Sequence, residues 1–181
     1  MTPVSMEPAM TKRSILPALV VLMLPLPAKA QSNPLVQSLM GLYGTTEQYI
    51  MATATDLDAD MYAFQPTDEV RTAGRILAHI ADSQFIFCSA AAGASNPHSG
   101  SFEETATTKD AVVSALEQGF EYCHEVYAGT TDMNASTAVA FFTGPNTRGG
   151  VLAFNSAHNY EHYGNLVTYM RLNGIVPPSS R

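Results

Sequence analysis

The segment VLAFNSAHNYEHYGNLVTYMRL, residues 151–172, decides the fold class of this chain. Its apolar residues cover most of a helical wheel, so the segment predicts a long and largely buried helix. Two histidines, His158 and His162, lie four residues apart and therefore one turn apart on the same face. An Asn-Gly pair at residues 173–174 ends the helix. We expect both imidazoles to face the interior of a helical protein, the alternative being a solvated polar face.

Three further segments have helical periodicity. They are residues 34–55, which follow an Asn-Pro start signal, residues 72–92, which Thr72 opens, and residues 109–127, which Gly129 stops. Residues 93–101 predict a loop, and residues 130–150 are irregular with a short extended piece at 139–142. Four amphipathic helices of about twenty residues predict an all-α protein, a four-helix bundle. In the first helix the periodicity rests on Leu35, Leu39, Leu42, Tyr43, Tyr49 and Ile50.

The N-terminal residues 1–30 have the pattern of a secretory signal peptide. Two basic residues at 12–13 precede a short apolar run over residues 15–26, and an Ala-Lys-Ala cleavage signal ends at Ala30. The apolar run is short for a membrane span, although an uncleaved N-terminal anchor is the alternative. We therefore expect cleavage after Ala30, a single domain over residues 31–181, a periplasmic or secreted location, and no membrane contact after cleavage.

The charge of the chain argues against nucleic-acid partners. The formal net charge is −7 at pH 7, and cleavage after Ala30 removes three basic residues and one acidic residue, which takes it to −9. An acidic protein of this kind repels the phosphate backbone of DNA and RNA. The expected partners are instead cations and small molecules, and a homodimer is plausible for a bundle of this size.

The two cysteines, Cys88 and Cys123, suggest a disulfide in an exported protein. Their spacing matches neither a CxxC redox motif nor a haem-attachment motif. If their helices formed a level hairpin, the two residues would lie at different depths, so a bridge would require staggered helices. The alternative is two small buried hydrophobic side chains on separate helices.

A pair of histidines at this spacing can bind one divalent cation, and a third ligand is expected because two bind weakly. His98 lies in the loop and is most simply solvated. His124 ends an E-x-x-H sequence, but a di-iron bundle needs two such motifs, so an exposed residue is the simpler interpretation. His79 lies in mid-helix among apolar residues, where a hydrogen-bonded core histidine is common. Opposite the pair, it would complete a three-histidine site between facing helices.

Such a site would hold one divalent ion, with Zn, Ni and Fe not distinguished, and would leave coordination positions open, as catalytic sites do. Its affinity should fall as the pH drops through the imidazole range near 6.5. The same residues match the inverted zinc-peptidase motif H-x-x-E-H with Glu161 as the base. That match is weak because no acidic residue follows His162 as a further ligand. Candidates for outer hydrogen-bond partners of the histidines are Glu161, Tyr160, Tyr163 and Asp82.

Two stretches of the chain resemble the signatures of the DinB-like (DinB/YfiT-type) proteins. They are RTAGRILAHIAD at residues 71–82 and HNYEHYGN at residues 158–165, and the similarity plausibly spans residues 34–180. The resemblance implies a four-helix bundle that binds a divalent metal through His79, His158 and His162. The family includes thiol-dependent transferases and isomerases and many members of unknown activity. An exported member is a departure, because cytosolic thiol cofactors are scarce outside the cytoplasm.

The sequence thus predicts an exported DinB-like divalent-metal-binding protein that hydrolyses a small molecule or transfers a thiol to it. The ion would lower the pKa of a water or thiol so that the nucleophile exists near pH 7. Two alternatives remain: a non-catalytic metal-binding or stress-related helical module, and a purely structural bundle without metal.

Overall fold

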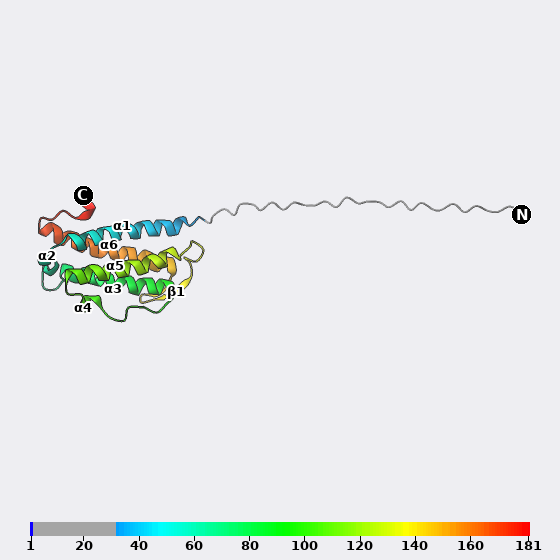
Figure 1. The fold of residues 1–181 in the computed structure, drawn as a ribbon, viewed down its shortest axis with the longest axis horizontal. Helices are drawn as coiled ribbons and strands as arrows, with labels where there is room; N and C mark the ends of the chain where they lie inside the picture. The colour runs from blue at the N-terminus through cyan, green and yellow to red at the C-terminus, as the bar shows by residue number, and fades with distance from the viewer. Residues whose placement is uncertain (2–31) are drawn as a thin grey trace. The chain divides into compact units, whose positions relative to one another are not determined.

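The computed structural model describes Met1 and residues 32–181, so the expected signal peptide and its cleavage position lie outside the described segment. Four long helices make up most of residues 32–181 (Figure 1). They are α1 (Pro34–Asp56), α3 (Ala73–Ala92), α5 (Lys109–Ala128) and α6 (Arg148–Leu172). None of the helices in residues 32–181 has the combination of length and hydropathy that a membrane span requires. The predicted all-α bundle is confirmed.

Short elements fill the connections between the long helices. They are α2 (Ala59–Ala63), α4 (Phe102–Thr105), the strands β1 (Ala138–Phe141) and β2 (Gly144–Thr147), and a C-terminal 3-10 helix η1 (Pro178–Ser180). The extended piece predicted at residues 139–142 is one half of an antiparallel hairpin, in which Ala138 pairs with Thr147. The second strand was not predicted, because its sequence GPNT indicates only a turn.

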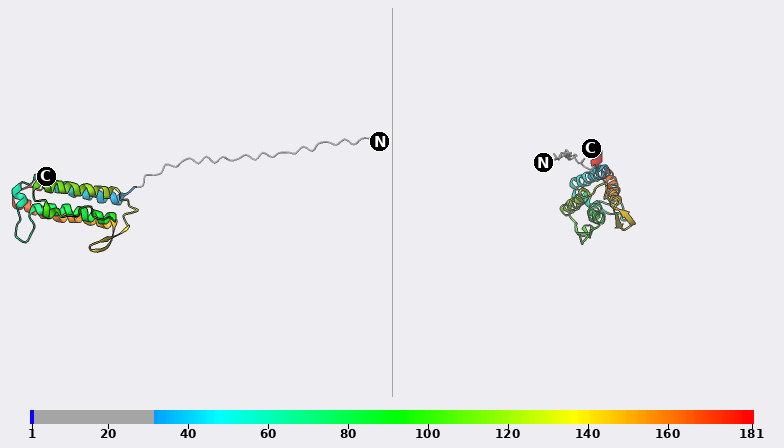
Figure 2. Two further views of the ribbon diagram at one scale, coloured as in Figure 1. Left: turned by 60° about the horizontal axis from the view of Figure 1, so that its bottom comes forward. Right: turned by 90° about the vertical axis from the view of Figure 1, so that its right-hand side faces the viewer.

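The helices are arranged so that α3 packs against α5 and α6, and α1 packs against the same two from the other side. Figure 2 shows the bundle from another side and from one end. Two contacts show that helices α3 and α5 run parallel. Gly119 lies against Gln84, and one turn further along both helices Cys123 is bonded to Cys88. The connection that carries α4 therefore runs back along the bundle. Helices α3 and α6 run antiparallel, since Tyr169 contacts Arg71 at one end and Arg148 contacts Ala91 at the other.

Threonine side chains cap the N-terminal ends of three of the four long helices. Thr72, Thr108 and Thr147 accept hydrogen bonds from backbone amides of the first turns of α3, α5 and α6. The cap at Thr147 explains why α6 begins at Arg148, three residues before its predicted start. Asn33 precedes α1 as predicted but does not cap it. Instead, the carboxylate of Asp132 accepts from the first amides of α1.

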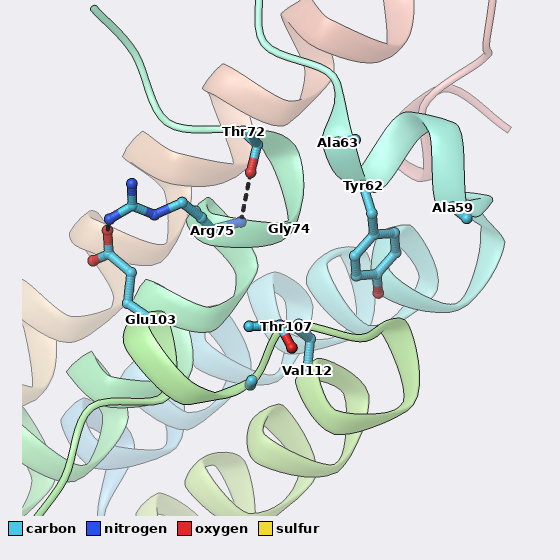
Figure 3. A pocket seen from close by; sticks show the side chains of 10 residues that line it. Ala59, Tyr62, Ala63, Thr72, Gly74, Arg75, Glu103, Thr107 and Val112 are labelled. Carbon is cyan, nitrogen blue, oxygen red and sulfur yellow. Dashed lines mark hydrogen bonds and ion pairs between the residues drawn. The ribbon is translucent and has the colours of Figure 1, made fainter.

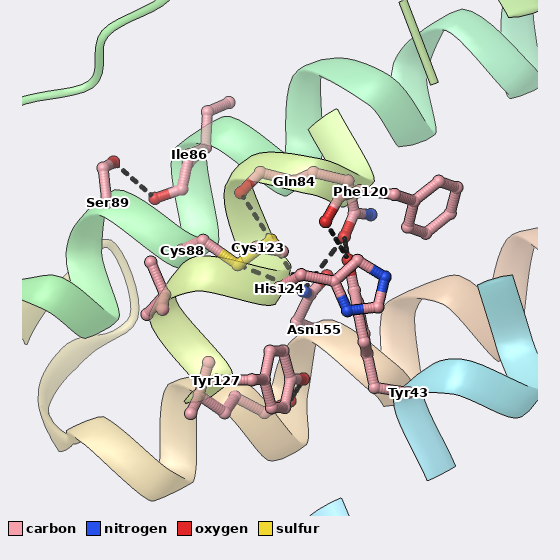
Figure 4. Close-up of a disulfide and its surroundings, with 12 residues drawn as sticks. Tyr43, Gln84, Ile86, Cys88, Ser89, Phe120, Cys123, His124, Tyr127 and Asn155 are labelled. Atoms are coloured by element: carbon pink, nitrogen blue, oxygen red, sulfur yellow. Dashed lines mark hydrogen bonds between the residues drawn. A yellow bond between two sulfur atoms is a disulfide. The ribbon is translucent and has the colours of Figure 1, made fainter. Parts of the chain in front are cut away.

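A disulfide joins Cys88 of α3 to Cys123 of α5, with 5.4 Å between the Cα atoms (Figure 4). The expectation that a bridge requires staggered helices was wrong, because it applied to a hairpin and these helices do not form one. Because α3 and α5 are parallel and both cysteines lie near the C-terminal ends, the two residues share one depth without any stagger. A buried polar group lies beside the bridge, where the Asn155 amide donates to Gln84 and approaches both sulfur atoms.

Candidate metal centre

Three histidines meet between α3 and α6, with His162 buried and His79 and His158 half-buried. His79 lies on α3, and His158 and His162 lie on successive turns of α6. The Nε2 atom of His158 is 3.2 Å from Nε2 of His79 and 3.0 Å from Nε2 of His162. All three candidate ligand atoms lie within 4.8 Å of one another. The antiparallel packing of the two helices brings together the three residues that the sequence singles out.

Two of the three nitrogen pairs, His79–His158 and His158–His162, have the spacing expected of two ligands on one ion. A zinc ion binds imidazole nitrogen at about 2.0–2.1 Å, so two ligands of the same ion lie roughly 3 Å apart. The Nε2 atom of His158 carries either one N–H or one lone pair, so it cannot form a full hydrogen bond with both neighbouring Nε2 atoms at once. The set of His79, His158 and His162 could therefore hold a metal ion.

The environment keeps these imidazoles neutral. Burial, reinforced by the neighbouring rings of His162 and His79, lowers the pKa of His158 to about 3. Burial and the ring of His79 lower the pKa of His162 to about 4. The pKa of His79 is also lowered, first by burial and then by the charge of Arg71, against the opposing effect of Glu103. Neutral imidazole is the form that binds metal, so the site is ready for a cation at pH 7.

Glu103 of α4 is the carboxylate that contacts the triad from outside. Its Oε2 atom lies 3.4 Å from Nδ1 of His79, the ring atom on the far side from the other histidines. Its Oε1 atom forms ion pairs of 2.9 Å with both Arg71 and Arg75. A carboxylate in this place fixes the orientation of a ligand histidine and raises its basicity. No motif in the sequence marks Glu103, because it lies in the crossover between two helices.

Asp82 has a different role from the one considered from the sequence. Its carboxylate accepts hydrogen bonds from the amides of Phe102 and Glu103 and from the hydroxyl of Ser101. It thereby holds the start of α4 against α3, which places Glu103 beside His79. Among the other candidates, the Tyr163 hydroxyl bonds to Ser179 near the C-terminus.

The two remaining histidines lie outside the triad. His124 forms a 2.8 Å pair with Glu47, and its side chain is half exposed, in line with the exposed helical residue that was expected. His98 lies in the loop, as expected, but its side chain is only partly solvated. Its ring stacks on Phe102 with 3.9 Å between centroids, and its Nε2 atom lies 3.6 Å from Asp82. The aromatic contact holds the loop against α4 and leaves the His98 side chain 24% exposed.

Space for a small molecule adjoins the histidines on two sides. A cavity of about 320 Å³ is lined by His162, Arg71 and Tyr169, and another of about 340 Å³ is lined by His79 and Arg71. Both volumes lie near the lower end of the range for ligand sites.

Four phenylalanines form an aromatic cluster on the His158 side, in which Phe87 lies 5.0 Å from the His158 ring. The cluster consists of Phe87, Phe141, Phe142 and Phe154. A third cavity, of about 300 Å³, lies between α2 and the starts of α3 and α5 and does not include a histidine (Figure 3).

Comparison with solved structures finds the same fold in proteins of low sequence identity. A DinB-like protein from Bacillus cereus superimposes with a TM-score of 0.68 at 16% identity, covering 78% of this chain and 95% of that one. A DinB-like protein from Bacillus subtilis gives a TM-score of 0.60 at 17% identity, covering 76% of this chain and 92% of that one. A conserved protein from Enterococcus faecalis superimposes with a TM-score of 0.61 at 14% sequence identity, covering 76% of this chain and 95% of that one.

A search of curated proteins finds no match. The family model for the DinB superfamily matches residues 42–166, a span that begins within α1 and includes both histidine-bearing helices up to Leu166. This span is more than half of the chain. With the fold and the matched residues in agreement, the chain belongs to the DinB superfamily.

Proposed function

We propose that this protein is an exported metal-dependent enzyme that acts on a small molecule, as a hydrolase or a thiol transferase. The observation that carries the proposal is the convergence of three Nε2 atoms from His79, His158 and His162, of which His162 is buried and the other two half-buried. One divalent ion, with Zn, Ni and Fe as the candidates, would be held by these three nitrogens. When bound, such an ion supplies Lewis-acid chemistry and activates a water or thiol nucleophile near pH 7.

The surroundings of the histidines support a catalytic rather than a purely structural site. Three protein ligands are typical of catalytic zinc sites, whereas structural sites have four. The cavities beside His162 and His79 give a small molecule two routes of approach. Glu103 orients His79, and Phe87 of the aromatic cluster packs against the ring of His158.

A non-catalytic metal-binding or stress-related module is the second candidate, because His162 is only 8% exposed and the ion would be well enclosed. The two candidates differ in whether water reaches the ion. Water-proton relaxation with the site loaded with Mn²⁺ or high-spin Co²⁺ would measure this. Exchangeable water supports the enzyme, and its absence supports the module.

Export is supported by two independent features. The first thirty residues have the pattern of a signal peptide, and a buried disulfide joins Cys88 to Cys123. Disulfides persist in oxidising compartments outside the cytoplasm and are rare within it. Expression of the full chain in a bacterium, followed by fractionation and N-terminal sequencing, tests this part. A mature N-terminus at Gln31 in the periplasm or medium is expected, and an intact chain in the cytoplasm would refute it.

Metal content tests the proposal as a whole. Purified wild-type protein, loaded with Zn²⁺ and freed of excess ion, should carry the metal, and His158→Ala should not. His124→Ala is the matched control, because His124 is a helical histidine paired with Glu47 outside the site. If the wild type and His158→Ala carry equally little metal, the proposed site does not exist.

A further inference from the structure

Arg71 lies where a substrate beside the histidines would meet it. Arg71 lines both the cavity that includes His162 and the cavity that includes His79. A group bound in either cavity would therefore lie close to its positive charge.

The structure fixes this arginine at two points and leaves its terminal nitrogens free. The Tyr169 hydroxyl donates to the Arg71 carbonyl at 2.9 Å, and Arg71 Nε donates to Glu103 at 2.9 Å. Within residues 32–181, no protein acceptor bonds to the two Nη atoms of Arg71. A guanidinium held by Nε keeps a pair of N–H groups directed outward, which is the geometry that binds a carboxylate or a similar oxyanion through two hydrogen bonds.

Two acidic residues near Arg71 already have other partners and do not bind its Nη atoms. Glu103 is already bonded to Arg71 through Nε and to Arg75, and Asp82 is occupied at the start of α4. Glu69 lines the His162 cavity from an exposed position. Asn165 of that cavity carries a hydrogen-bond donor for a further oxygen of an anion, whereas the Thr168 hydroxyl already donates to the Gly164 carbonyl.

We propose that Arg71 is the anion-binding residue of this site, so that the small molecule carries a carboxylate or a similar oxyanion bound in the His162 cavity. The assignment deepens the proposed function, on which it rests for the histidines as the reacting centre. It makes Arg71 a specificity-determining residue: the molecule is held by its anionic group while another part lies against the histidine nitrogens.

Arg75 provides a matched control. It binds the same Oε1 atom of Glu103 at the same distance of 2.9 Å, but it lines the histidine-free cavity between α2 and α3. Figure 3 shows Arg75 reaching Glu103 from that side. Arg71→Gln and Arg75→Gln therefore each remove one ion pair with Glu103, and they differ in whether they remove a guanidinium from the side of the histidines.

The test is an NMR titration of ¹⁵N-labelled protein with acetate, and with acetamide as the uncharged molecule of the same shape. The guanidinium signal of Arg71 should shift and saturate with acetate but not with acetamide. Acetate affinity, followed through the ring signals of His162, should fall about tenfold or more in Arg71→Gln and stay within about twofold in Arg75→Gln. Equal affinity in Arg71→Gln and wild type, or an Arg71 response that is the same for both molecules, overturns the assignment.

Titrating the metal-free and the zinc-loaded protein separates this assignment from the proposed function. If zinc does not bind, the two titrations coincide and the metal proposal fails, while a saturable Arg71 response still supports the anion site. If zinc binds and Arg71 does not respond to acetate, only the anion site fails.

Discussion

The Nδ1 atom of His79 lies 3.4 Å from Oε2 of Glu103, although the two residues belong to different helices joined through a long connection. The contact exists because α3 and α5 run parallel, which requires the chain to return along the bundle between them. The returning segment carries α4, and the Asp82 carboxylate holds the first turn of α4 by accepting hydrogen bonds from two of its backbone amides. The connection thus supplies the carboxylate that directs Nε2 of His79 toward the other two histidines.

Replacing this carboxylate should weaken metal binding. In Glu103→Gln the contact with His79 loses its charge, and both arginine ion pairs are lost, so the zinc dissociation constant should rise about 10- to 100-fold. Competition with a chromophoric chelator would measure it. Glu104→Gln is the control, since this neighbouring acidic residue is exposed and has no contact with the triad. An unchanged affinity in Glu103→Gln would mean that packing alone orients His79.

Zinc affinity should persist well below the ordinary titration range of histidine. Three imidazoles with a pKa of 6.5 would lose about 600-fold in affinity between pH 7 and pH 5.5 through proton competition. The pKa of His158 is lowered to about 3 and that of His162 to about 4, and that of His79 is also lowered. The loss expected from sequence near pH 6.5 should therefore occur at lower pH. A change of less than about tenfold between pH 7 and 5.5 is expected, and a loss of several hundredfold would contradict the buried site.

The same shifts make the metal-free protein less stable in acid. Between the folded pKa values and 6.5 the unfolded chain binds more protons than the folded one, so stability is fully present above about pH 6.5 and declines toward pH 3–4. Urea unfolding at pH 7 and pH 5 should show a lower free energy of unfolding at pH 5. The decline should be smaller in His158→Gln, which cannot titrate. An identical decline in both proteins would assign the effect to other groups.

The disulfide should stabilise the bundle by limiting the unfolded chain. Cys88 and Cys123 are 35 residues apart, and a loop of that length corresponds to about 4 kcal/mol in the chain-entropy model, with measured values of about 2–4. The double variant Cys88→Ala/Cys123→Ala should show this loss in urea unfolding. The wild type unfolded with a reductant should approach it. Equal stability of the oxidised wild type and the double variant would refute the bridge.

Close packing of α5 on α3 predicts opposite effects at two glycines. A Cβ atom at Gly119 would lie 3.0 Å from the Ala81 carbonyl oxygen and from Gln84 Cβ, whereas one at Gly41 would meet nothing within 4 Å. Gly119→Ala should therefore destabilise by about 1–3 kcal/mol, and Gly41→Ala should stabilise by up to about 1 kcal/mol. Thermal unfolding of both variants measures the difference. A neutral Gly119→Ala would show that the helices can separate without loss.

The local signals in the sequence predicted the bundle and the histidine triad well. Thr72 caps α3 as expected, and the four-residue spacing of His158 and His162 places both on the face toward His79. These features depend on short-range rules of helix geometry. Periodicity was less reliable on α1, where Leu35 and Leu42 are exposed. The fully buried positions there include Thr46 and Thr53, whose hydroxyls bond to carbonyls of the preceding turn and so can be buried.

Features that depend on the order in which helices pack could not be predicted from the sequence. The parallel pairing of α3 and α5 decides that Cys88 and Cys123 are level and that Glu103 reaches His79, and neither helix carries a signal for it. The cap of α1 is likewise long-range, because Asp132 comes from the connection before the hairpin. The sequence places Arg71 in the first of the two family motifs, but its position beside the histidine cavities depends on the packing of the helices.

X-ray absorption spectroscopy of the zinc-loaded protein tests the central claim most directly, that His79, His158 and His162 bind one ion together. The account predicts one zinc per chain, with three imidazole nitrogens at about 2.0–2.1 Å, and loss of this signature in His79→Ala as well as in His158→Ala. A zinc environment that contains fewer than three imidazoles in the wild type, or that is unchanged in His79→Ala, would contradict it.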